Sequence, residues 1–488
     1  MTRNEPFSSR DPRRAALEFL YARTNYERFL TPPYTAKALK LARMRELLRR
    51  LGNPQDAAPI VHIAGTKGKG STAVMVGNML QAAGYRVGVF TSPHLERVEE
   101  RLAVDGRPCS SDTFVALLSE MMPIITEMDR QAVQEEGAEF GPTYFEILTA
   151  IALLHFARSN VDFIVLEVGL GGRLDSTNVC RPAVTAITSI SYDHTQQLGD
   201  TLERIAWEKA GIIKHRVPLV CGVESPIPRE VIHGVCRELE APVIQLGTHF
   251  RYRYRATPSP AAPLGGRFDF VYHRDKSELG LSDLILAPPG AHQAANASVA
   301  LAIAVVLSEN GFPIGEEAVR RALASTVVPA RIEVLGTQPL TVLDASHNVA
   351  SVRALLDTLG TADSPGKRIA VFGTTQGKDY RGMLQELAAA TDRVILTQYT
   401  DNPRAVSLGD LAEAWPAEPT RAARLLAATP EKAWQTAAEL AEPDDIVFVA
   451  GSFFLAAEIR PTIQRLPLGR PLGRASDEVS ASRERLDG

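Results

Sequence analysis

The segment Pro59-Ile-Val-His-Ile-Ala-Gly-Thr-Lys-Gly-Lys-Gly-Ser71 decides the fold class. Its first six residues are mostly apolar or β-branched, and we expect them to form a buried strand. A glycine-rich loop follows, and helical spacing then runs from about Ser71 to Ala83. This order is typical of a phosphate-binding loop, in which backbone N–H groups and a helix N-terminus face an anion.

The loop does not match the strict G-x-x-x-x-G-K-[ST] pattern, because Gly70 follows Lys69 and Ile63 stands where the first glycine belongs. A generic glycine turn is therefore the alternative interpretation. The strand before the loop and the helix after it favour phosphate binding. In that case Lys69 reaches the β- and γ-phosphates of a nucleotide, and Ser71 or Thr72 approaches the metal.

Short apolar runs alternate with helical patterns over most of the chain, which is typical of parallel sheets covered by helices on both faces. We therefore predict an α/β fold of two domains, an N-terminal P-loop ATPase domain with a mainly parallel sheet and a smaller Rossmann-like C-terminal domain. The strands are expected at residues 59–64, 86–90, 161–166, 184–190, 218–223, 242–246, 341–343, 368–372, 393–397 and 445–450. Helices besides the first are expected at residues 145–158 and 296–309.

The predicted boundaries place the N-terminal domain with the phosphate loop at residues 1–328, a linker at 329–339 and the C-terminal domain at 340–466. Residues 467–488 lack periodic apolar residues and are predicted to be a disordered tail. The segment 251–289 is rich in Pro, Arg and aromatic residues. It is expected to form either a small antiparallel sheet or a long surface insertion.

The composition excludes several classes of protein. Of 488 residues, 45% are hydrophobic and 23% charged, which indicates a globular enzyme rather than a disordered or fibrous chain. A net charge of −4 provides no general field for nucleic acid. No apolar run is long enough for a membrane span, and Met1 to Arg14 is polar, so we expect no membrane partner and no secretion. The four cysteines form no C-x-x-C pair, which favours free thiols in the cytoplasm.

Polar residues follow three further predicted strands, at the sheet edge where ligands of parallel sheets bind. Ser92 lies in the turn Thr91 to Leu95. Glu167 ends an apolar strand, and a carboxylate there suits a hard cation, although an exposed strand end is the alternative. His194 follows another strand, where a histidine without a ligand is the ordinary finding.

Two further stretches have competing interpretations. Tyr144 and Phe145 are suited to stack on a flat heterocycle, with Glu146 or Asp175 bonded to its edge, but they also fit the buried stripe of a helix. The glycines between residues 169 and 172 resemble a dinucleotide fingerprint. Leu174 replaces its third glycine and no clear helix follows, so an NAD site is a poor fit.

Taken together, these motifs resemble the folylpolyglutamate synthase/dihydrofolate synthase family of the Mur-ligase superfamily, over roughly residues 30 to 460. The loop Gly65 to Ser71 resembles the family element G-T-x-G-K-G-S, with Lys67 where the family usually has Asn. Glu167 to Asn178 is the most specific match. His292 to Asn296 resembles H-Q-x-x-N.

The C-terminal half carries weaker matches. Pro329-Ala-Arg331 resembles P-G-R, and Asp344-Ala-Ser-His-Asn348 resembles D-G-A-H-N-P. These two elements depart from the family patterns at Ala330, Ala345, Ser346 and Val349. The polar positions are therefore better defined than the geometry of their loops.

The resemblance implies a monomeric ATP- and Mg²⁺-dependent ligase that adds L-glutamate to dihydropteroate, to tetrahydrofolate (poly)glutamates, or to both, through an acyl phosphate. The implied catalytic residues are Lys69, Lys209 and His347. The implied ATP-binding residues are Gly65, Thr66, Lys67, Gly68, Lys69, Gly70, Ser71, Asn296, Arg331 and Asp344. Two Mg²⁺ ions are expected on Ser92, Glu167, His194 and a carbamylated Lys209. The implied substrate-binding residues are Thr143, Tyr144, Phe145, Glu146, Leu174, Asp175, Ser176 and, with less support, Ser452.

Two other functions fit part of the pattern. A different Mur-type ligase, acting on a peptidoglycan precursor or another acid, shares the phosphate loop and the two α/β domains. A nucleotide-binding regulator without ligase chemistry shares the loop alone. The run Glu167 to Asn178, together with Thr143 to Glu146, favours a folate substrate.

Overall fold

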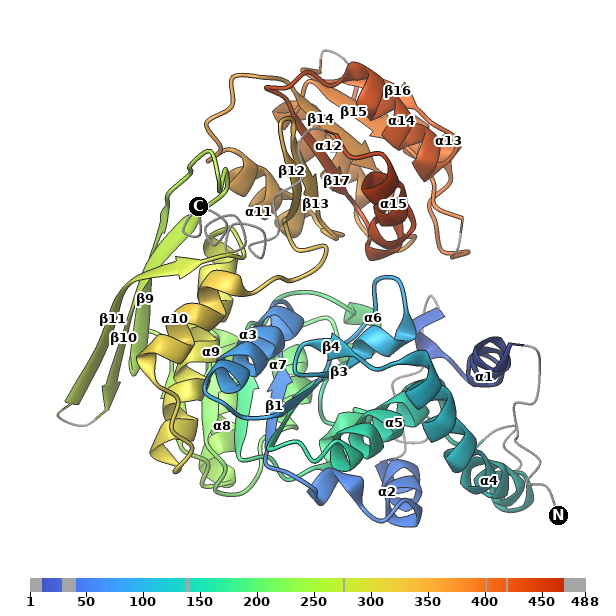
Figure 1. Ribbon diagram of the computed structural model, residues 1–488, viewed down its shortest axis with the longest axis vertical. Helices are drawn as coiled ribbons and strands as arrows, with labels where there is room; N and C mark the ends of the chain where they lie inside the picture. Colours follow the sequence, from blue (N-terminus) through green and yellow to red (C-terminus); the bar gives the residue numbers. More distant parts are fainter. Residues whose placement is uncertain are drawn as a thin grey trace, which may run out of the picture. The chain divides into compact units, whose positions relative to one another are not determined.

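The computed structural model describes residues 11–28, 41–136, 141–274, 277–400, 402–417 and 420–468. The chain forms two compact units (Figure 1). Unit 1 comprises residues 1–255, 267–287 and 291–326, and unit 2 comprises 256–266, 288–290 and 327–488. The N-terminal domain predicted over 1–328 therefore differs from unit 1, because residues 256–266, 288–290 and 327–328 within it are grouped with unit 2. The predicted tail, apart from residues 467 and 468, lies outside the described residues.

Unit 1 is built on an eight-stranded sheet in the order β4-β3-β2-β5-β1-β6-β7-β8. Its strands are β1 (Ile60–Ala64), β2 (Val87–Phe90), β3 (Leu102–Val104), β4 (Arg107–Pro108), β5 (Phe163–Glu167), β6 (Val184–Ile187), β7 (Leu219–Cys221) and β8 (Val243–Gln245). The pairs from β2 to β8 are parallel, and β3 and β4 continue the edge as antiparallel strands. Every residue of β1, β5 and β6 is buried, as expected for parallel strands covered on both faces.

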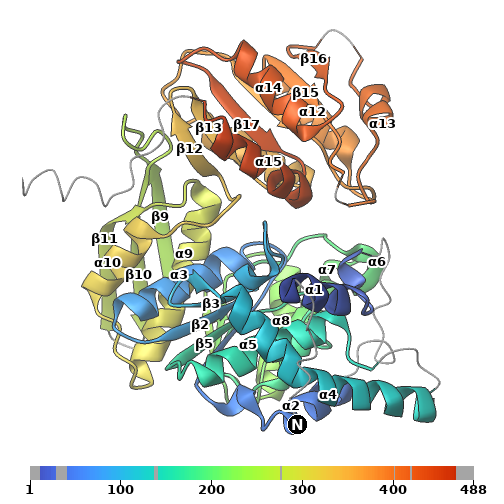
Figure 2. The ribbon, with the colours of Figure 1, turned by 45° about the vertical axis from the view of Figure 1, so that its right-hand side comes forward.

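Helices cover both faces of this sheet. They are α1 (Pro12–Tyr21), α2 (Leu41–Arg50), α3 (Lys69–Ala82), α4 (Ser111–Glu136), α5 (Tyr144–Arg158), α6 (Thr195–Leu198), α7 (Leu202–Ala210), α8 (Pro226–Glu238), α9 (Ala291–Glu309) and α10 (Glu316–Ser325). Val61 and Ile63 of β1 pack in one core with α3 and α9, whereas Ile60 packs in another with α4 and α5. Helices α3, α9 and α10 lie side by side (Figure 2).

Helix α9 is the one described helix that is long and apolar enough to cross a membrane. In the structure, 67% of its most apolar window is buried inside the protein. Most of its alanines and valines belong to the same core as β1 and α3. The helix is therefore accounted for as a core helix that packs on the sheet.

Residues 250–286 form a separate three-stranded sheet, in the order β11-β10-β9. Its strands are β9 (Phe250–Ala256), β10 (Gly266–Arg274) and β11 (Ser277–Leu286). Phe250, Phe268 and Phe270 face the core, while Arg253 on the other face pairs with Asp269 at 3.1 Å. The structure thus selects the small sheet over the surface insertion for most of the segment 251–289.

Unit 2 has a six-stranded sheet in the order β12-β13-β17-β14-β15-β16. Its strands are β12 (Glu333–Thr337), β13 (Leu340–Leu343), β14 (Arg368–Phe372), β15 (Arg393–Leu396), β16 (Ala423–Leu426) and β17 (Ile446–Ala450). Only β12, which lies in the predicted linker, pairs antiparallel. The helices are α11 (Val349–Leu359), α12 (Tyr380–Ala390), α13 (Leu408–Glu413), α14 (Pro430–Leu440) and α15 (Phe453–Arg465). The predicted α/β class is confirmed.

Unit 2 is not a continuous piece of chain. Leu264, from the stretch 256–266 between β9 and β10, is only 2% exposed. It belongs to the core that contains Ile332 of unit 2, Leu340 of β13 and the helix α11. The core of unit 2 therefore includes a side chain that precedes its main segment by more than 60 residues.

Close packing of β2 on α5 gives a test of this fold. A Cβ at Gly88 of β2 would lie 2.5 Å from Cγ of Phe156 on α5, so alanine cannot enter without moving the strand or the helix. We expect Gly88→Ala to lower the free energy of unfolding by about 1–3 kcal/mol, measured by chemical denaturation.

The matched control is Gly234 of α8, where the nearest atom to a built Cβ is Arg237 Nη2 at 3.9 Å. In this helix interior, alanine is expected to raise the free energy of unfolding by about 1 kcal/mol. Equal destabilisation by the two substitutions would contradict the packing described for β2.

Candidate active site

The phosphate loop joins β1 to α3 and needs glycine at two positions. Gly65 has φ 149° and Gly68 has φ 85°, a backbone conformation that favours glycine. A Cβ at Gly65 would lie 1.9 Å from Thr188 Oγ1, and one at Gly68 would lie 2.0 Å from Asn296 Oδ1. Since α3 begins at Lys69, the N–H groups of its first turn are available to an anion at this loop.

The loop is held by the segment that follows β6. Thr66 N donates to the carbonyl of Ser189 at 2.7 Å, and Lys67 N donates to Ser189 Oγ at 3.1 Å. Thr188 Oγ1 donates to the carbonyl of Lys67 at 2.6 Å. These hydrogen bonds hold the backbone of the loop against the segment after β6.

Asn296, predicted as an ATP-binding residue, lies beside this loop although it is 228 positions beyond Gly68 in the sequence. It is carried by α9, and its side-chain Nδ2 donates to Gln293 Oε1 at 3.0 Å. Thr72 Oγ1 of α3 approaches its backbone carbonyl at 3.5 Å. The fold therefore brings the H-Q-x-x-N element to the phosphate loop.

Glu167 ends β5, between β1 and β2 in the sheet, and is only 4% exposed. Its Oε2 accepts a hydrogen bond from Ser92 N at 2.9 Å. A Cβ at Gly70 would lie 3.1 Å from the same oxygen. The carboxylate, the Ser92 turn and the phosphate loop thus converge at the carboxyl edge of three adjacent strands.

Lys67 is bonded to the loop that carries His194. Its Nζ lies 2.7 Å from Asp193 Oδ2. His194 is about half exposed, and its Nε2 lies 4.0 Å from Asp193 Oδ1. Sequence reasoning did not assign Asp193 a role, although its position beside His194 in a loop after a strand offered a signal. The structure shows that the lysine replacing the family's Asn is paired with this carboxylate.

Lys209 lies in the last turn of α7 and is only 4% exposed. Burial is the main cause that lowers its pKa to about 7, and the positive charges of Lys69 and Lys67 lower it further. The negative charge of Asp193 acts in the opposite direction and raises the pKa. Its neighbour Glu208 forms an ion pair with Arg173 at 2.8 Å. The amine therefore sits in the dry, cationic surroundings that favour its neutral form.

Among the described residues, no three His, Cys, Asp or Glu side chains form a metal-binding group. The predicted set instead offers one carboxylate, one hydroxyl, one imidazole and one lysine. Mg²⁺ takes oxygen ligands and commonly binds through one or two carboxylates with phosphate and water. Glu167 beside Ser92, at the edge of a phosphate loop, fits a divalent ion on these grounds.

Of the four residues Thr143 to Glu146, only Phe145 is partly exposed. Thr143 caps α5, and the Glu146 carboxylate accepts from Thr143 N at 2.8 Å and forms an ion pair with Arg43 at 2.8 Å. Tyr144 is 1% exposed. A Cβ at Gly169 would lie 2.6 Å from Phe145 Cζ, so the Phe145 ring lies over the glycine loop that follows β5.

The stretch Leu174 to Ser176 is held from within. The buried carboxylate of Asp175 accepts from the backbone N–H groups of Gly169 and Leu170 at 3.1 and 3.0 Å. Burial raises the pKa of Asp175, against the effect of its hydrogen bonds. The Ser176 hydroxyl lies 2.8 Å from Thr149 Oγ1 of α5. Of the three predicted residues, only Leu174 is partly exposed.

In unit 2, Asp344 fixes the segment that carries Arg331. Its Oδ2 accepts from Ile332 N at 2.8 Å and its Oδ1 from Ser346 N at 2.7 Å. Ala330 and Ile332, which flank Arg331, both have φ 52°. Ala330 thus adopts the conformation for which the P-G-R pattern supplies glycine, at a steric cost of about 1–2 kcal/mol.

The remaining predicted residues of unit 2 follow β13 and β17. His347 Nδ1 lies 2.9 Å from the Ala345 carbonyl, which requires the proton on Nδ1 and leaves Nε2 as an acceptor in the neutral ring. Ser452 caps α15 and lies 3.2 Å from Thr375 Oγ1, which in turn lies 2.7 Å from the Tyr399 hydroxyl. Sequence reasoning assigned no role to Thr375 or to Tyr399.

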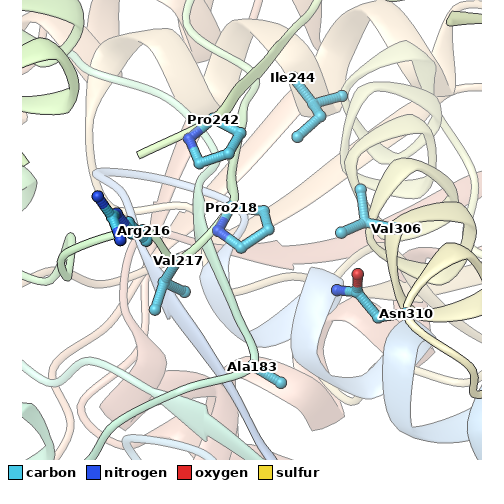
Figure 3. Close-up of a pocket in the computed structure, with 8 residues that line it drawn as sticks. All are labelled: Ala183, Arg216, Val217, Pro218, Pro242, Ile244, Val306 and Asn310. Atoms are coloured by element: carbon cyan, nitrogen blue, oxygen red, sulfur yellow. The ribbon is translucent and has the colours of Figure 1, made fainter. Parts of the chain in front are cut away.

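A cavity of about 460 Å³ in unit 1 is separate from this site (Figure 3). It is lined by Ala183, Arg216, Val217, Pro218, Pro242, Ile244, Val306 and Asn310. Ala183, Pro218 and Pro242 directly precede β6, β7 and β8, so the cavity lies at the amino edge of the sheet. The phosphate loop and Glu167 lie at the carboxyl edge, and none of the predicted site residues lines the cavity.

The chain matches two protein families along its length. Residues 63–304 match the Mur ligase middle domain, and residues 330–453 match the Mur ligase, glutamate ligase domain. The dihydrofolate synthase/folylpolyglutamate synthase of Bacillus subtilis is 35% identical over 437 residues, or 87% of this chain and 95% of that protein. The Escherichia coli protein of the same name is 31% identical over 425 residues, or 87% and 91% of the two chains.

Solved structures agree with these matches. The Mycobacterium tuberculosis folylpolyglutamate synthase complexed with ADP is 32% identical, with a TM-score of 0.80 over 94% of this chain and 100% of that chain. The bifunctional folylpolyglutamate synthase/dihydrofolate synthase from Yersinia pestis, complexed with AMPPNP and a Mn ion, is 31% identical. Its TM-score is 0.76 over 93% and 98% of the two chains.

The burial of Lys209 predicts how stability depends on pH. With a pKa of about 7 when folded and 10.5 when unfolded, the unfolded state binds more protons between these values. The free energy of unfolding should therefore rise with pH across that window, by at most about 1.4 kcal/mol per unit. Below the folded pKa this contribution is constant. Lys209→Met should remove the rise, measured by urea denaturation in bicarbonate-free buffer with a chelator. Parallel pH profiles for the two proteins would contradict the burial of this amine.

Proposed function

The chain belongs to the folylpolyglutamate synthase/dihydrofolate synthase family of Mur ligases, and we propose that it joins L-glutamate both to dihydropteroate and to reduced folates. It is an ATP-dependent acid–amino-acid ligase of folate metabolism that uses a divalent metal. The observation that supports the proposed site is the convergence of the phosphate loop, Glu167, Ser92 and Asn296 within unit 1.

The reaction must first make a carboxylate reactive. Transfer of the γ-phosphoryl group of ATP to the carboxylate yields an acyl phosphate, which has a good leaving group. The amine of glutamate then attacks the acyl carbon, and the tetrahedral intermediate expels phosphate as the amide forms. We assign Lys69 and the N-terminus of α3 to neutralise charge on the nucleotide phosphates, with Asn296 as a further nucleotide contact.

The metal sites divide between two groups of residues. Glu167 and Ser92 are assigned to one Mg²⁺ ion, and His194 and carbamylated Lys209 to a second. When bound, such ions neutralise phosphate and acyl-phosphate oxygens. The Lys67–Asp193 pair ties the loop of His194 to the phosphate loop, which supports a shared role for the two segments.

Carbamylation of Lys209 requires a neutral amine, which attacks CO₂ and releases a proton to leave a carbamate anion. Burial and the adjacent charges of Lys69 and Lys67 favour the neutral amine. After modification the same two cations would stabilise the anion. The modification thus turns an unfavourable buried charge into a favourable one.

We assign the folate ring to the surface between α5 and the glycine loop. Phe145 is suited to stack on a pteridine ring, and Leu174 adds an apolar contact. The other predicted residues, Thr143, Tyr144, Glu146, Asp175 and Ser176, are buried and frame this surface. Glu146 and Asp175 are already engaged by Arg43 and by backbone amides, which supports an orienting role for both carboxylates.

In unit 2, Arg331 and Asp344 are assigned to ATP, and His347 and Ser452 to glutamate. The Nδ1–H of His347 is fixed by the Ala345 carbonyl, and Nε2 is the acceptor suited to the glutamate amine. We further propose that the enzyme is a cytoplasmic monomer that binds neither nucleic acid nor membrane. The four cysteines are free thiols, which supports a reducing compartment.

The main test is Mg²⁺-dependent phosphate release from ATP with L-glutamate and, separately, dihydropteroate or tetrahydrofolate. We expect release with each substrate, and a loss of about 10²–10³-fold in kcat for Lys69→Ala, as for removal of one preorganised charge-stabilising donor. The control is Lys432→Ala, an exposed lysine on α14.

Release with one folate substrate only would reduce the proposal to a single activity. Folded protein that binds ATP but releases no phosphate with either substrate would overturn the folate assignment. Phosphate release would then be measured with the substrates of other Mur-type ligases.

The carbamate has its own test. In ¹³C-bicarbonate, the wild-type protein should show one protein-bound carbamate resonance by ¹³C NMR. Lys209→Met should lack it, because Lys209 is the amine whose pKa burial lowers to about 7. A resonance that persists in the variant would place the carbamate on another amine.

A further inference from the structure

His62 is a fully buried histidine at the centre of β1, the strand that leads into the phosphate loop. In the sheet it lies between Leu166 of β5 and Thr185 of β6. A buried imidazole costs free energy unless its nitrogen atoms find partners. His62 is not among the residues assigned to the nucleotide or to a metal ion, so its presence in the core needs another explanation.

The hydrogen bonds around Asp175 determine which nitrogen of His62 carries the proton. The Asp175 carboxylate accepts from the N–H groups of Gly169, Leu170 and Thr177. Its remaining partner is the Thr177 hydroxyl, at 2.5 Å from Oδ1. Because the one hydroxyl proton is donated there, Thr177 Oγ1 must accept from His62 Nε2, which lies 2.8 Å away.

The surroundings of the ring keep this arrangement fixed. Burial, together with the positive charge of Lys214, lowers the pKa of His62 to about 3, so the ring is neutral near neutral pH. Nδ1 then carries no proton and lies 3.9 Å from the Cys180 thiol. Burial raises the pKa of Cys180 to about 12, which keeps the thiol protonated as a weak donor.

The chain of bonds joins parts of the site that are distant in sequence. It starts on the strand before the phosphate loop and ends on the Gly169–Leu170 turn, which follows Glu167. Gly169 lies under the Phe145 ring. Asp175 itself directly precedes Ser176 in the stretch assigned to the folate substrate.

We propose that His62 is a positioning residue, whose Nε2–H sets the Thr177 hydroxyl and through it the Asp175 carboxylate that holds the Gly169–Leu170 turn under Phe145. The inference rests on the proposed folate surface and names the group that orients it. His62 touches no substrate in this scheme. It acts on the pteridine side of the site and leaves the phosphate loop itself unchanged.

The kinetic test compares His62→Leu, which removes the donor, with His62→Gln, which returns an N–H donor near the position of Nε2. For His62→Leu we expect the KM for dihydropteroate or tetrahydrofolate to rise about tenfold, the effect of losing about 1.4 kcal/mol. The Kd for ADP should stay within about twofold. His62→Gln should recover most of the lost folate KM.

Thr177→Val removes the middle bond without changing the side chain's shape, and it serves as the test if His62→Leu does not fold. It should raise the folate KM as His62→Leu does, and the double variant should be no worse than either single variant, because both break one chain of bonds. If the wild-type protein turns over folates and these variants keep the wild-type folate KM, the role of His62 is overturned and the proposed function stands. Absence of wild-type turnover with folates would overturn the proposed function.

The spectroscopic test does not depend on any substrate. In protein labelled with ¹⁵N at histidine, the signal lost in His62→Gln should be that of a neutral Nε2–H tautomer. It should not change between about pH 6 and about pH 8, where ordinary histidines titrate. An Nδ1–H tautomer would reverse the direction of the bonds to Thr177 and Asp175 and overturn the proposal.

Discussion

The close approach of the phosphate loop to the segment after β6 is the constraint on which unit 1 depends. At Gly65 there is no room for a Cβ, since Thr188 Oγ1 would lie 1.9 Å away. The Thr188 hydroxyl donates to the Lys67 carbonyl, and the Ser189 carbonyl accepts a hydrogen bond from the Thr66 N–H group. Because β1 and β6 are adjacent parallel strands, this close approach brings together the loops that carry Lys67 and His194. It also places the N-terminus of α3 at the position where an anion would bind.

The same arrangement concentrates positive charge before any substrate binds. Lys67, Lys69 and the buried Lys209 lie near one another, and Asp193 is the carboxylate that pairs with Lys67. Such a site favours the phosphates of a nucleotide, and it also favours any chemistry that makes Lys209 neutral or anionic. Phosphate binding and the state of Lys209 are therefore two responses to one electrostatic field.

Local patterns in the sequence were sufficient to predict the parallel strands except β16, whose mostly exposed residues form no buried apolar run. The positions of Glu167, Ser92 and Asn296 after strands or on a helix agree with the motifs. Strands β3 and β4 were missed because neither lies in an apolar run as long as those around β7 and β8, which are also short strands. The bonds that orient the site were not predictable. Glu146 pairs with Arg43 across 103 positions and His62 with Thr177 across 115, and no local pattern in the sequence indicates either pairing. Such pairs are fixed by tertiary packing.

The inclusion of residues 256–266 in unit 2 has a consequence for how this gene can be cut and recombined. A fragment that starts at Val327 would encode the six-stranded sheet but not Leu264, so its core would lack one of its buried side chains. The same holds for a chimera that takes its last third from a relative, in which residues 256–266 and the rest of the unit 2 core come from different parents. The modules that evolution or an engineer can exchange here are therefore defined by shared packing and not by a single point of crossover in the sequence.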